Sequence, residues 1–399
     1  MTIDTCAYTR FLEQVASDLD IPPSKYKQAV ERYQSVGAWL ERGTYPGAAG
    51  IPIICPQGSF RLGTVTRPIR NGIEAAYDID LVCELLIAMA ATDPKSVKYL
   101  VGNRLRENET YARLLDEEGR RCWTLEYAEQ DGVGFHLDVL PAVPNRRGTL
   151  DTSIAITHKR DTAYSWSASN PRGYGVWFDG RNAGAFNLAA ASQKVALRSN
   201  YPELFARVDD VPDQLVRTPL QRVIQILKRH RDMRFNQRQR ILHAPISVII
   251  TTLAAHLYRN EPDAFSALNS ILTQLRAFSR LVDAAPNRLV LDSNALIQRK
   301  ADGTWHIGNP SNPGENFADR WHEDNHARAR AFFLWVEAAY EDLVQIVTEP
   351  NRIMIKDRLS RALHATPVLK HISIIAPVAA APAIPRVEIA SKPKPWRAE

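Results

Sequence analysis

The chain has 399 residues, of which 45% are hydrophobic and 24% are charged, and its formal net charge is +6. This is the composition of a folded globular protein, and the length suffices for one two-lobed unit or for two to three domains. The four cysteines are scattered and form no CxxC pair, which argues against a zinc site or a disulfide scaffold and fits a reducing cytoplasm.

The sequence carries no sign of export or membrane insertion. Its first residues lack the basic and apolar segments of a secretion signal. The apolar run Pro245–Leu257 is shorter than the ~18 residues of a membrane span and includes polar side chains. We therefore expect a cytoplasmic protein without membrane association, and its mildly basic balance suits polyanions such as nucleotides.

Two helices are predicted at the start of the chain, over about residues 4–45, because apolar residues recur there at helical spacing. Two consecutive prolines separate them, and proline suits the first turn of the second helix. The glycines of residues 47–50 are expected to end this second helix. A short strand at Ile51–Ile54 then leads into a turn made by Gly58 and Ser59.

The next part of the chain alternates loops, strands and helices. In chain order, the pattern predicts a polar loop over 66–76, a strand over 77–82, a helix over 94–118 and two strands over 121–128 and 134–140. Asp131 and Gly132 between the last two strands are a strong hairpin signal, because this pair favours a tight turn.

After about residue 185 the apolar spacing is mostly helical. The clearest helices are predicted at 218–235, 244–258, 262–280 and 325–347. From about residue 366 the chain becomes rich in proline and alanine, a composition that cannot build a core. We therefore expect a flexible tail over 366–399.

Asp78 and Asp80 are the most informative residues of the chain. Alternation along a strand places both carboxylates on one face and the apolar Tyr77 and Ile79 on the other. Two neighbouring carboxylates repel, so the pKa of one should rise unless a cation lies between them. A divalent cation removes that cost, and Mg²⁺ takes oxygen ligands together with substrate phosphates.

Asp138 is a third candidate carboxylate. On the predicted strand 134–140, alternation places it opposite the apolar residues. An isolated carboxylate on an otherwise apolar strand needs a partner, which a metal held by Asp78 and Asp80 would supply. The neighbouring His136 is as consistent with a buried, hydrogen-bonded histidine as with a functional one.

The predicted helix 218–235 contributes a candidate cation. The following helix, 244–258, begins with Ser247 near its N-terminus, where free N–H groups and the helix dipole favour an anion. Lys228 of the first helix and Ser247 of the second would together make a phosphate clamp.

The other basic residues of this region are interpreted as a solvated surface. We expect Arg222, Arg229 and Arg234 to face solvent, and nucleic-acid binding by the basic run 229–240 is the less favoured alternative. The large aromatic residues expected in the core are Trp177, Phe178 and Trp321.

These features together resemble a known family. The motif consists of the turn residues Gly58, Ser59, Gly63 and Thr64 followed by the carboxylates Asp78, Asp80 and Asp138. It is similar to the nucleotidyltransferase core shared by DNA polymerase β, oligoadenylate synthase and cyclic GMP–AMP synthase. The segments 220–231, 245–252 and 309–317 resemble more narrowly the bacterial CD-NTases, the signal-producing enzymes of CBASS anti-phage defence.

The resemblance covers residues 7 to about 350 and implies a bilobal α+β fold of the polymerase-β type, with a mixed-sheet catalytic lobe and a helical lobe. It divides the chain into N-terminal helices that pack along both lobes (1–45), a nucleotidyltransferase core (46–185), a helical lobe (186–365) and the flexible tail (366–399).

The resemblance also implies the roles of the site residues. Asp78 and Asp80 would bind two Mg²⁺ ions, for which Mn²⁺ would substitute, and Asp138 would hold the catalytic ion. The residues that would contact the donor nucleotide are Gln57, Gly58, Ser59, Lys228 and Ser247. Members of the family often place an aromatic residue beside this serine to stack on the base. Here Val248 stands at that position, so the sequence assigns no stacking residue.

The implied activity joins GTP and ATP into a cyclic dinucleotide second messenger, cyclic GMP–AMP, by two-metal phosphoryl transfer. The product would activate an anti-phage effector protein, and a conjugation enzyme would act on the tail, although the chain ends in Glu399 where a small residue is expected. No stable nucleic-acid binding is expected. Two alternatives stay open: a template-independent RNA or tRNA nucleotidyltransferase, which would need a long basic RNA track, and a non-catalytic nucleotide sensor.

Overall fold

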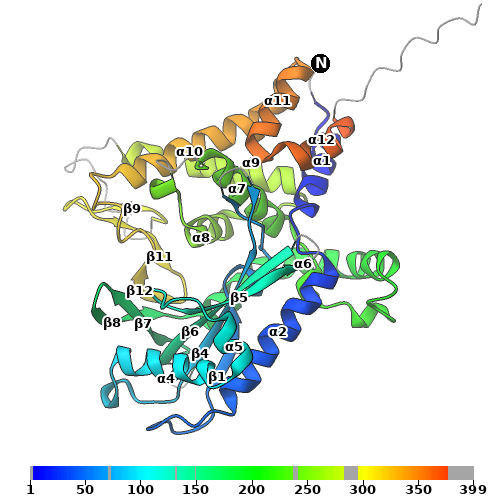
Figure 1. Ribbon diagram of the computed structural model, residues 1–399. Helices are drawn as coiled ribbons and strands as arrows, with labels where there is room; N and C mark the ends of the chain where they lie inside the picture. Colours follow the sequence, from blue (N-terminus) through cyan, green and yellow to red (C-terminus); the bar gives the residue numbers. More distant parts are fainter. Residues whose placement is uncertain are drawn as a thin grey trace, which may run out of the picture.

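The computed structural model describes residues 3–70, 73–130, 133–148, 150–236, 241–282 and 295–375. It has two lobes, a sheet lobe in the lower half of Figure 1 and a helical lobe in the upper half. The predicted fold class, a bilobal α+β protein with a mixed-sheet lobe and a helical lobe, is confirmed.

The helices are α1 (Thr5–Ser17), α2 (Pro23–Glu41), α3 (Gly58–Arg61), α4 (Pro94–Arg106), α5 (Glu109–Leu114), α6 (Pro171–Asn200), α7 (Pro219–Arg234), α8 (Ser247–Leu257), α9 (Ala264–Arg276), α10 (Ala327–Leu343), α11 (Arg352–Leu363) and α12 (Ala365–His371). The strands are β1 (Ile53–Gln57), β2 (Ile69–Arg70), β3 (Ile73–Glu74), β4 (Tyr77–Glu84), β5 (Trp123–Gln130), β6 (Val133–Pro144), β7 (Ile154–Arg160), β8 (Ala163–Ser169), β9 (Gln298–Arg299), β10 (Trp305–His306), β11 (Gly308–Asn309) and β12 (Asn312–Asn316).

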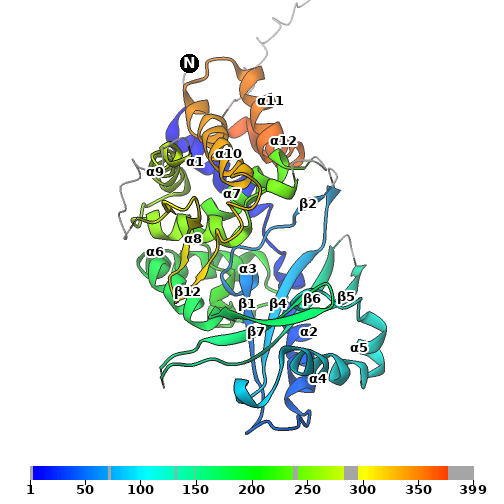
Figure 2. The same ribbon diagram turned by 90° about the vertical axis from the view of Figure 1, so that its left-hand side faces the viewer.

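The main sheet has the strand order β1-β4-β6-β7-β8, and β5 pairs with β6. Strands β4 and β6 are parallel, whereas the other pairs in this sheet are antiparallel. Figure 2 shows α2, α4 and α5 gathered beside the sheet. Because Tyr77, Ile79 and Leu81 are buried in the core of this lobe, alternation directs Asp78 and Asp80 to the other face of β4.

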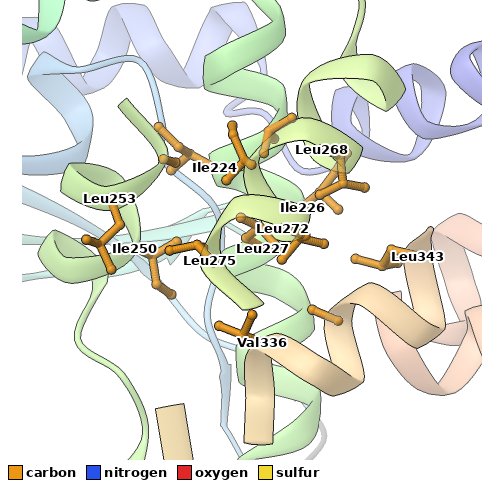
Figure 3. Close-up of a cluster of buried hydrophobic side chains, with 14 of the residues drawn as sticks. Ile224, Ile226, Leu227, Ile250, Leu253, Leu268, Leu272, Leu275, Val336 and Leu343 are labelled. Carbon is orange, nitrogen blue, oxygen red and sulfur yellow. The ribbon is translucent and has the colours of Figure 1, made fainter. Parts of the chain in front are cut away.

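The core of the helical lobe forms where α7, α8, α9 and α10 meet. Figure 3 shows Ile224 and Leu227 of α7 close to Ile250 of α8, Leu272 of α9 and Val336 of α10. Ile224 and Leu227 lie three residues apart, as expected for the apolar face of one helix. Their packing fixes α7 and α8, the two helices on which the predicted phosphate clamp lies. No helix in the described ranges is long and apolar enough to cross a membrane.

The two N-terminal helices belong to different cores. Tyr8 and Phe11 of α1 are buried in the helical lobe, whereas Val36 and Leu40 of α2 are buried in the sheet lobe. The chain between them carries Asp20 at the junction of the lobes.

Asp20 is an acceptor for three side chains of the helical lobe. Its carboxylate accepts hydrogen bonds from Arg217 Nε at 2.9 Å, Arg222 Nη1 at 2.7 Å and Gln225 Nε2 at 2.8 Å. The prediction that Arg222 faces solvent is therefore wrong, because this guanidinium is held at the junction by a carboxylate distant in the sequence.

Two element predictions in the sheet lobe differ from the structure. Helix α2 ends at Glu41 rather than at 47–50, because buried Tyr45 turns back and donates to the carbonyl of Leu40 at 2.9 Å. The expected polar loop 66–76 contains the short β2–β3 ladder, whose residue Ile69 is buried.

Two expected boundaries fall within helices. Helix α6 runs through residue 185, and α12 covers the expected start of the tail, where Val368 is fully buried in the helical lobe. The remainder of the tail, 376–399, lies outside the described residues. So do Asp131 and Gly132, although the antiparallel pairing of β5 with β6 confirms that these strands are adjacent. The aromatic residues predicted in the core, Phe178 and Trp321, are buried, and Trp177 packs against it.

Candidate active site

A cavity of about 410 Å³ lies where the sheet lobe meets the helical lobe, and every predicted site residue lines it. The sheet lobe contributes Gln57, Gly58, Ser59, Asp78, Asp80 and Asp138, and the helical lobe contributes Lys228, Ser247 and Val248. The fold therefore brings together residues that are far apart in the sequence.

Strand register explains how the carboxylates meet. Asp80 of β4 is paired with Gln57 of β1 on one side and with Asp138 of β6 on the other. Because paired residues project to the same face of a sheet, these three side chains form one row across neighbouring strands. Asp78 lies beside His136 of β6, and its Oδ1 is 3.4 Å from His136 Nδ1.

The turn before β4 requires glycine at its first position. Gly58 has a φ of +65°, a conformation that other residues rarely adopt. A Cβ atom at this position would lie 2.1 Å from Asp80 Oδ2. The turn is closed by a hydrogen bond of 3.0 Å from Thr64 N to the carbonyl of Ser59. Gly58 thus lets the main chain approach the central carboxylate of the row.

The carboxylates repel one another in this partly buried setting. Burial raises the pKa of Asp80 to about 7, and the charges of Asp138 and Asp78 act in the same direction, while Lys228 opposes them. Burial also raises the pKa of Asp138, although a hydrogen bond of 2.6 Å from Thr124 Oγ1 counteracts it. A bound cation would stabilise the site, because it would reduce the repulsion between these carboxylates.

The donor chemistry of the three aspartates fits magnesium. In the described part of the chain, no group of three His, Cys, Asp or Glu side chains is already arranged to hold a metal ion. Asp78, Asp80 and Asp138 nevertheless offer only carboxylate oxygens, which Mg²⁺ prefers. The repulsion that adds to the effect of burial on the pKa of Asp80 is also what a divalent cation relieves.

Lys228 and Ser247 line the cavity from the helical lobe. The Lys228 ammonium is buried, and its Nζ donates to the carbonyl of Thr64 at 3.0 Å. Burial lowers the pKa of Lys228 to about 7, and the neighbouring Arg231 contributes. Ser247 is the first residue of α8, and its Oγ accepts a hydrogen bond of 2.8 Å from Arg231 Nη1. The predicted placement at a helix N-terminus is confirmed, whereas the phosphate clamp stays a prediction.

Comparisons with known proteins agree with the nucleotidyltransferase function that the sequence predicts. No family model matches the chain. A c-di-GMP synthase of Roseivirga ehrenbergii is 28% identical over 315 residues, which cover 78% of this chain and 72% of that protein. The cyclic dinucleotide synthase CdnG of Bradyrhizobium diazoefficiens is 27% identical over 321 residues, 78% of this chain and 70% of that protein.

These relatives confirm the predicted resemblance to the CD-NTases. Both relatives are cyclic dinucleotide synthases, and the protein is a nucleotidyltransferase, as the three aspartates predicted. The solved structure of the Bradyrhizobium diazoefficiens CD-NTase CdnG in complex with GTP shares its fold, with a TM-score of 0.67 and 22% identity over 92% of this chain and 98% of that one.

The cavity also includes residues to which the sequence assigned no role. They are Arg61, Ser169, Tyr174, Thr251, Asn309, Glu315 and Phe317. The resemblance of segment 309–317 to the family was the only signal for three of them. Tyr174 lies within the long helix α6, where a buried aromatic residue gives no functional signal.

The basic residues of α7 differ from the expected solvated surface. Arg229 is fully buried, and its Nη2 donates to Glu74 Oε1 at 2.7 Å. The prediction for Arg229 is therefore wrong, because β3 supplies a carboxylate that covers it. Arg234 is exposed, as predicted. Part of the basic run, 237–240, lies outside the described residues.

Proposed function

We propose that this protein is a CD-NTase that joins two nucleoside triphosphates into a cyclic dinucleotide that contains guanine. The observation that carries the proposal is the cavity in which three aspartates of the sheet lobe face a lysine and a helix N-terminus of the helical lobe. The name of the Roseivirga relative, c-di-GMP synthase, and the GTP in the similar structure support guanine.

Two arguments predict different second bases. The sequence resemblance predicts GTP and ATP as substrates and cyclic GMP–AMP as the product. The name of the Roseivirga relative favours GTP alone and c-di-GMP. Both products contain guanine, so the proposal for GTP is common to the two.

The side chains of the cavity would bind the triphosphate and accept the proton of the attacking hydroxyl. Gln57 and Ser59 of the sheet lobe would bind the triphosphate oxygens from one wall. Ser247 would bind them from the helical lobe, where Lys228 would also balance their charge. Two Mg²⁺ ions held by Asp78, Asp80 and Asp138 would supply charge neutralisation and a lowered pKa of the attacking hydroxyl.

The bonding changes are simple. The ribose hydroxyl oxygen of the acceptor forms a bond to the α-phosphorus of the donor, and the bond from that phosphorus to pyrophosphate breaks. Asp138 would accept the hydroxyl proton, and Ser59, Lys228 and Ser247 would hold the departing pyrophosphate. A second transfer of the same kind within the linear product would close the ring.

The test is an incubation of the purified protein with Mg²⁺ and all four NTPs, one of them labelled at a time. We expect a phosphatase-resistant product, identified by mass and by nuclease mapping of its linkages. The double variant Asp78→Ala with Asp80→Ala should give none, whereas Glu323→Gln, a change at an exposed position, should retain wild-type activity. Extended RNA in place of a cyclic product would favour the RNA nucleotidyltransferase, and an active double variant would refute the enzymatic site.

We also propose that the product activates an effector protein in anti-phage defence, and that a conjugation enzyme acts on the tail. The first idea is supported by the family and tested by phage challenge of cells that carry the wild-type protein or the double aspartate variant. For the second, mass spectrometry of the whole defence system should detect tail-linked adducts, and their absence would remove it.

A further inference from the structure

The β11–β12 hairpin brings an amide, a carboxylate and an aromatic ring to one wall of the cavity. Asn309, Glu315 and Phe317 all line it. Figure 1 shows the hairpin reaching from the helical lobe toward the sheet. Because side chains alternate along a strand, Glu315 and Phe317 lie on the same side of the extended chain. None of these residues has a role in the phosphoryl transfer described above.

Glu315 is held at one oxygen only. Asn309 is 5% exposed, and its Oδ1 accepts hydrogen bonds of 2.8 Å from both the main-chain N and the Oγ of Ser311. These donors fix the orientation of the amide, so its Nδ2 donates to Glu315 Oε2 at 2.8 Å. Within the described residues, Glu315 Oε1 accepts no hydrogen bond, and no cation forms an ion pair with Glu315.

A carboxylate in a triphosphate-binding cavity needs an uncharged donor. It would repel phosphates. Burial raises the pKa of Glu315, and the hydrogen bond from Asn309 and the charge of Arg121 only partly oppose this. The ionised group can only accept hydrogen bonds. Among the nucleobases, guanine presents two adjacent donors on its Watson–Crick edge, N1–H and the N2 amino group. Adenine presents one amino group beside an acceptor, which would face the second carboxylate oxygen.

An aromatic platform lies beside this carboxylate. Phe317 is half-buried, and its ring meets Tyr174 edge to face with centroids 6.4 Å apart. Tyr174 is fixed in turn by a hydrogen bond of 2.8 Å between its hydroxyl and Thr252 Oγ1. Phe317 therefore offers the stacking surface that Val248 cannot provide.

We propose that Glu315 recognises the N1–H and N2 amino groups of guanine in bound GTP, while Phe317 stacks on the base. This inference rests on the proposed function, because it assumes that the cavity binds nucleotides, and it names Glu315 as a residue that selects the base. Phe317 would bind any base, since stacking is tolerant of base identity.

The test compares GTP, ITP and ATP, because ITP lacks only the N2 amino group of GTP. Equilibrium dialysis of the wild-type protein with each nucleotide should give the order GTP, ITP, ATP, with GTP bound about tenfold or more tighter than ATP. Glu315→Gln should reduce the ratio of GTP to ATP affinity about tenfold, because a glutamine amide can pair with the adenine edge. Phe317→Ala should weaken all three nucleotides alike, by about tenfold.

The matched control is Glu323→Gln, which should leave all three affinities unchanged. A Glu315→Gln protein that melts like the wild type and keeps its GTP-to-ITP and GTP-to-ATP ratios would overturn the inference. Equal binding of GTP and ITP by the wild-type protein would overturn it even if the variant failed to fold. Because binding is measured without turnover, these outcomes are distinct from failure of the proposed synthesis, which would appear as absence of a cyclic product with all four NTPs.

Discussion

Gly58→Ala should disable the enzyme by moving one carboxylate while the protein still folds. The new Cβ would lie 2.1 Å from Asp80 Oδ2, whereas a carbon and an oxygen without a covalent bond approach to about 3.3 Å. Asp80 must therefore shift by roughly 1.2 Å if the main chain stays in place. A displacement of about 1 Å in a catalytic geometry costs about a hundredfold in rate, so we expect kcat to fall at least that far.

The cost in stability should be much smaller. A non-glycine residue at a positive φ costs about 1–2 kcal/mol. Gly47→Ala is the matched control, because Gly47 has a φ of +80° and its added Cβ would only contact Ile87 at 4.0 Å. Chemical denaturation should show similar losses for the two variants, and steady-state synthesis of labelled product should show a loss of activity for Gly58→Ala alone. Equal activities in the two folded variants would refute the reasoning.

Three further predictions concern charge. Lys228→Gln should raise the KM for nucleotides about tenfold or more, because it removes the buried cation opposite the carboxylates. Lys300→Gln, at an exposed position outside the cavity lining, should have no effect in the same assay. Removal of divalent metal with EDTA should abolish synthesis, and added Mg²⁺ or Mn²⁺ should restore it; activity that survives would contradict the roles given to the three aspartates. Asp20→Asn should lower the free energy of unfolding at pH 7 by about 3 kcal/mol, because it breaks a partly buried ion network. Burial raises the pKa of Asp20, but Arg217 and Arg222 outweigh it and hold the pKa below its usual value, so this stability is present above about pH 4 and is lost as the pH falls through the lowered value. Urea titrations between pH 2 and 7 should show a shallower acid loss for Asp20→Asn than for the wild type, and identical slopes would refute the role of Asp20.

The sheet-lobe side of the cavity could be predicted because the sequence patterns that mark it are local. Period-two alternation is sufficient to place Asp78, Asp80 and Asp138 on the faces of their strands that oppose the apolar residues. The need for glycine at position 58 follows from the same turn, although the close approach to Asp80 appears only in three dimensions. The general architecture could be predicted for a similar reason, since long helices and strands carry strong periodic patterns.

The helical-lobe side was harder to predict because its contacts join distant parts of the chain. Asn309 orients Glu315 through a hydrogen bond, and the orientation of Asn309 depends in turn on a hydrogen bond from Ser311. No regular spacing in the sequence predicts these hydrogen bonds. The sequence predicts that Arg229 is solvated because its carboxylate partner, Glu74, lies in a hairpin for which the sequence predicts a loop. A buried charge can be recognised only when its partner is known.

One polar face of α7 explains how the cavity acquires its shape. Gln221, Gln225, Lys228 and Arg229 recur at helical spacing and each donates a hydrogen bond to a main-chain carbonyl of the segment 62–67. This segment follows directly on the Gly58 turn, so the bonds fix the turn and the carboxylate row relative to the helical lobe. The residues of this face therefore join the two lobes, and their hydrogen bonds also set the distance between the two walls of the cavity. Substitutions along it should change nucleotide affinity even where the side chain does not reach the cavity.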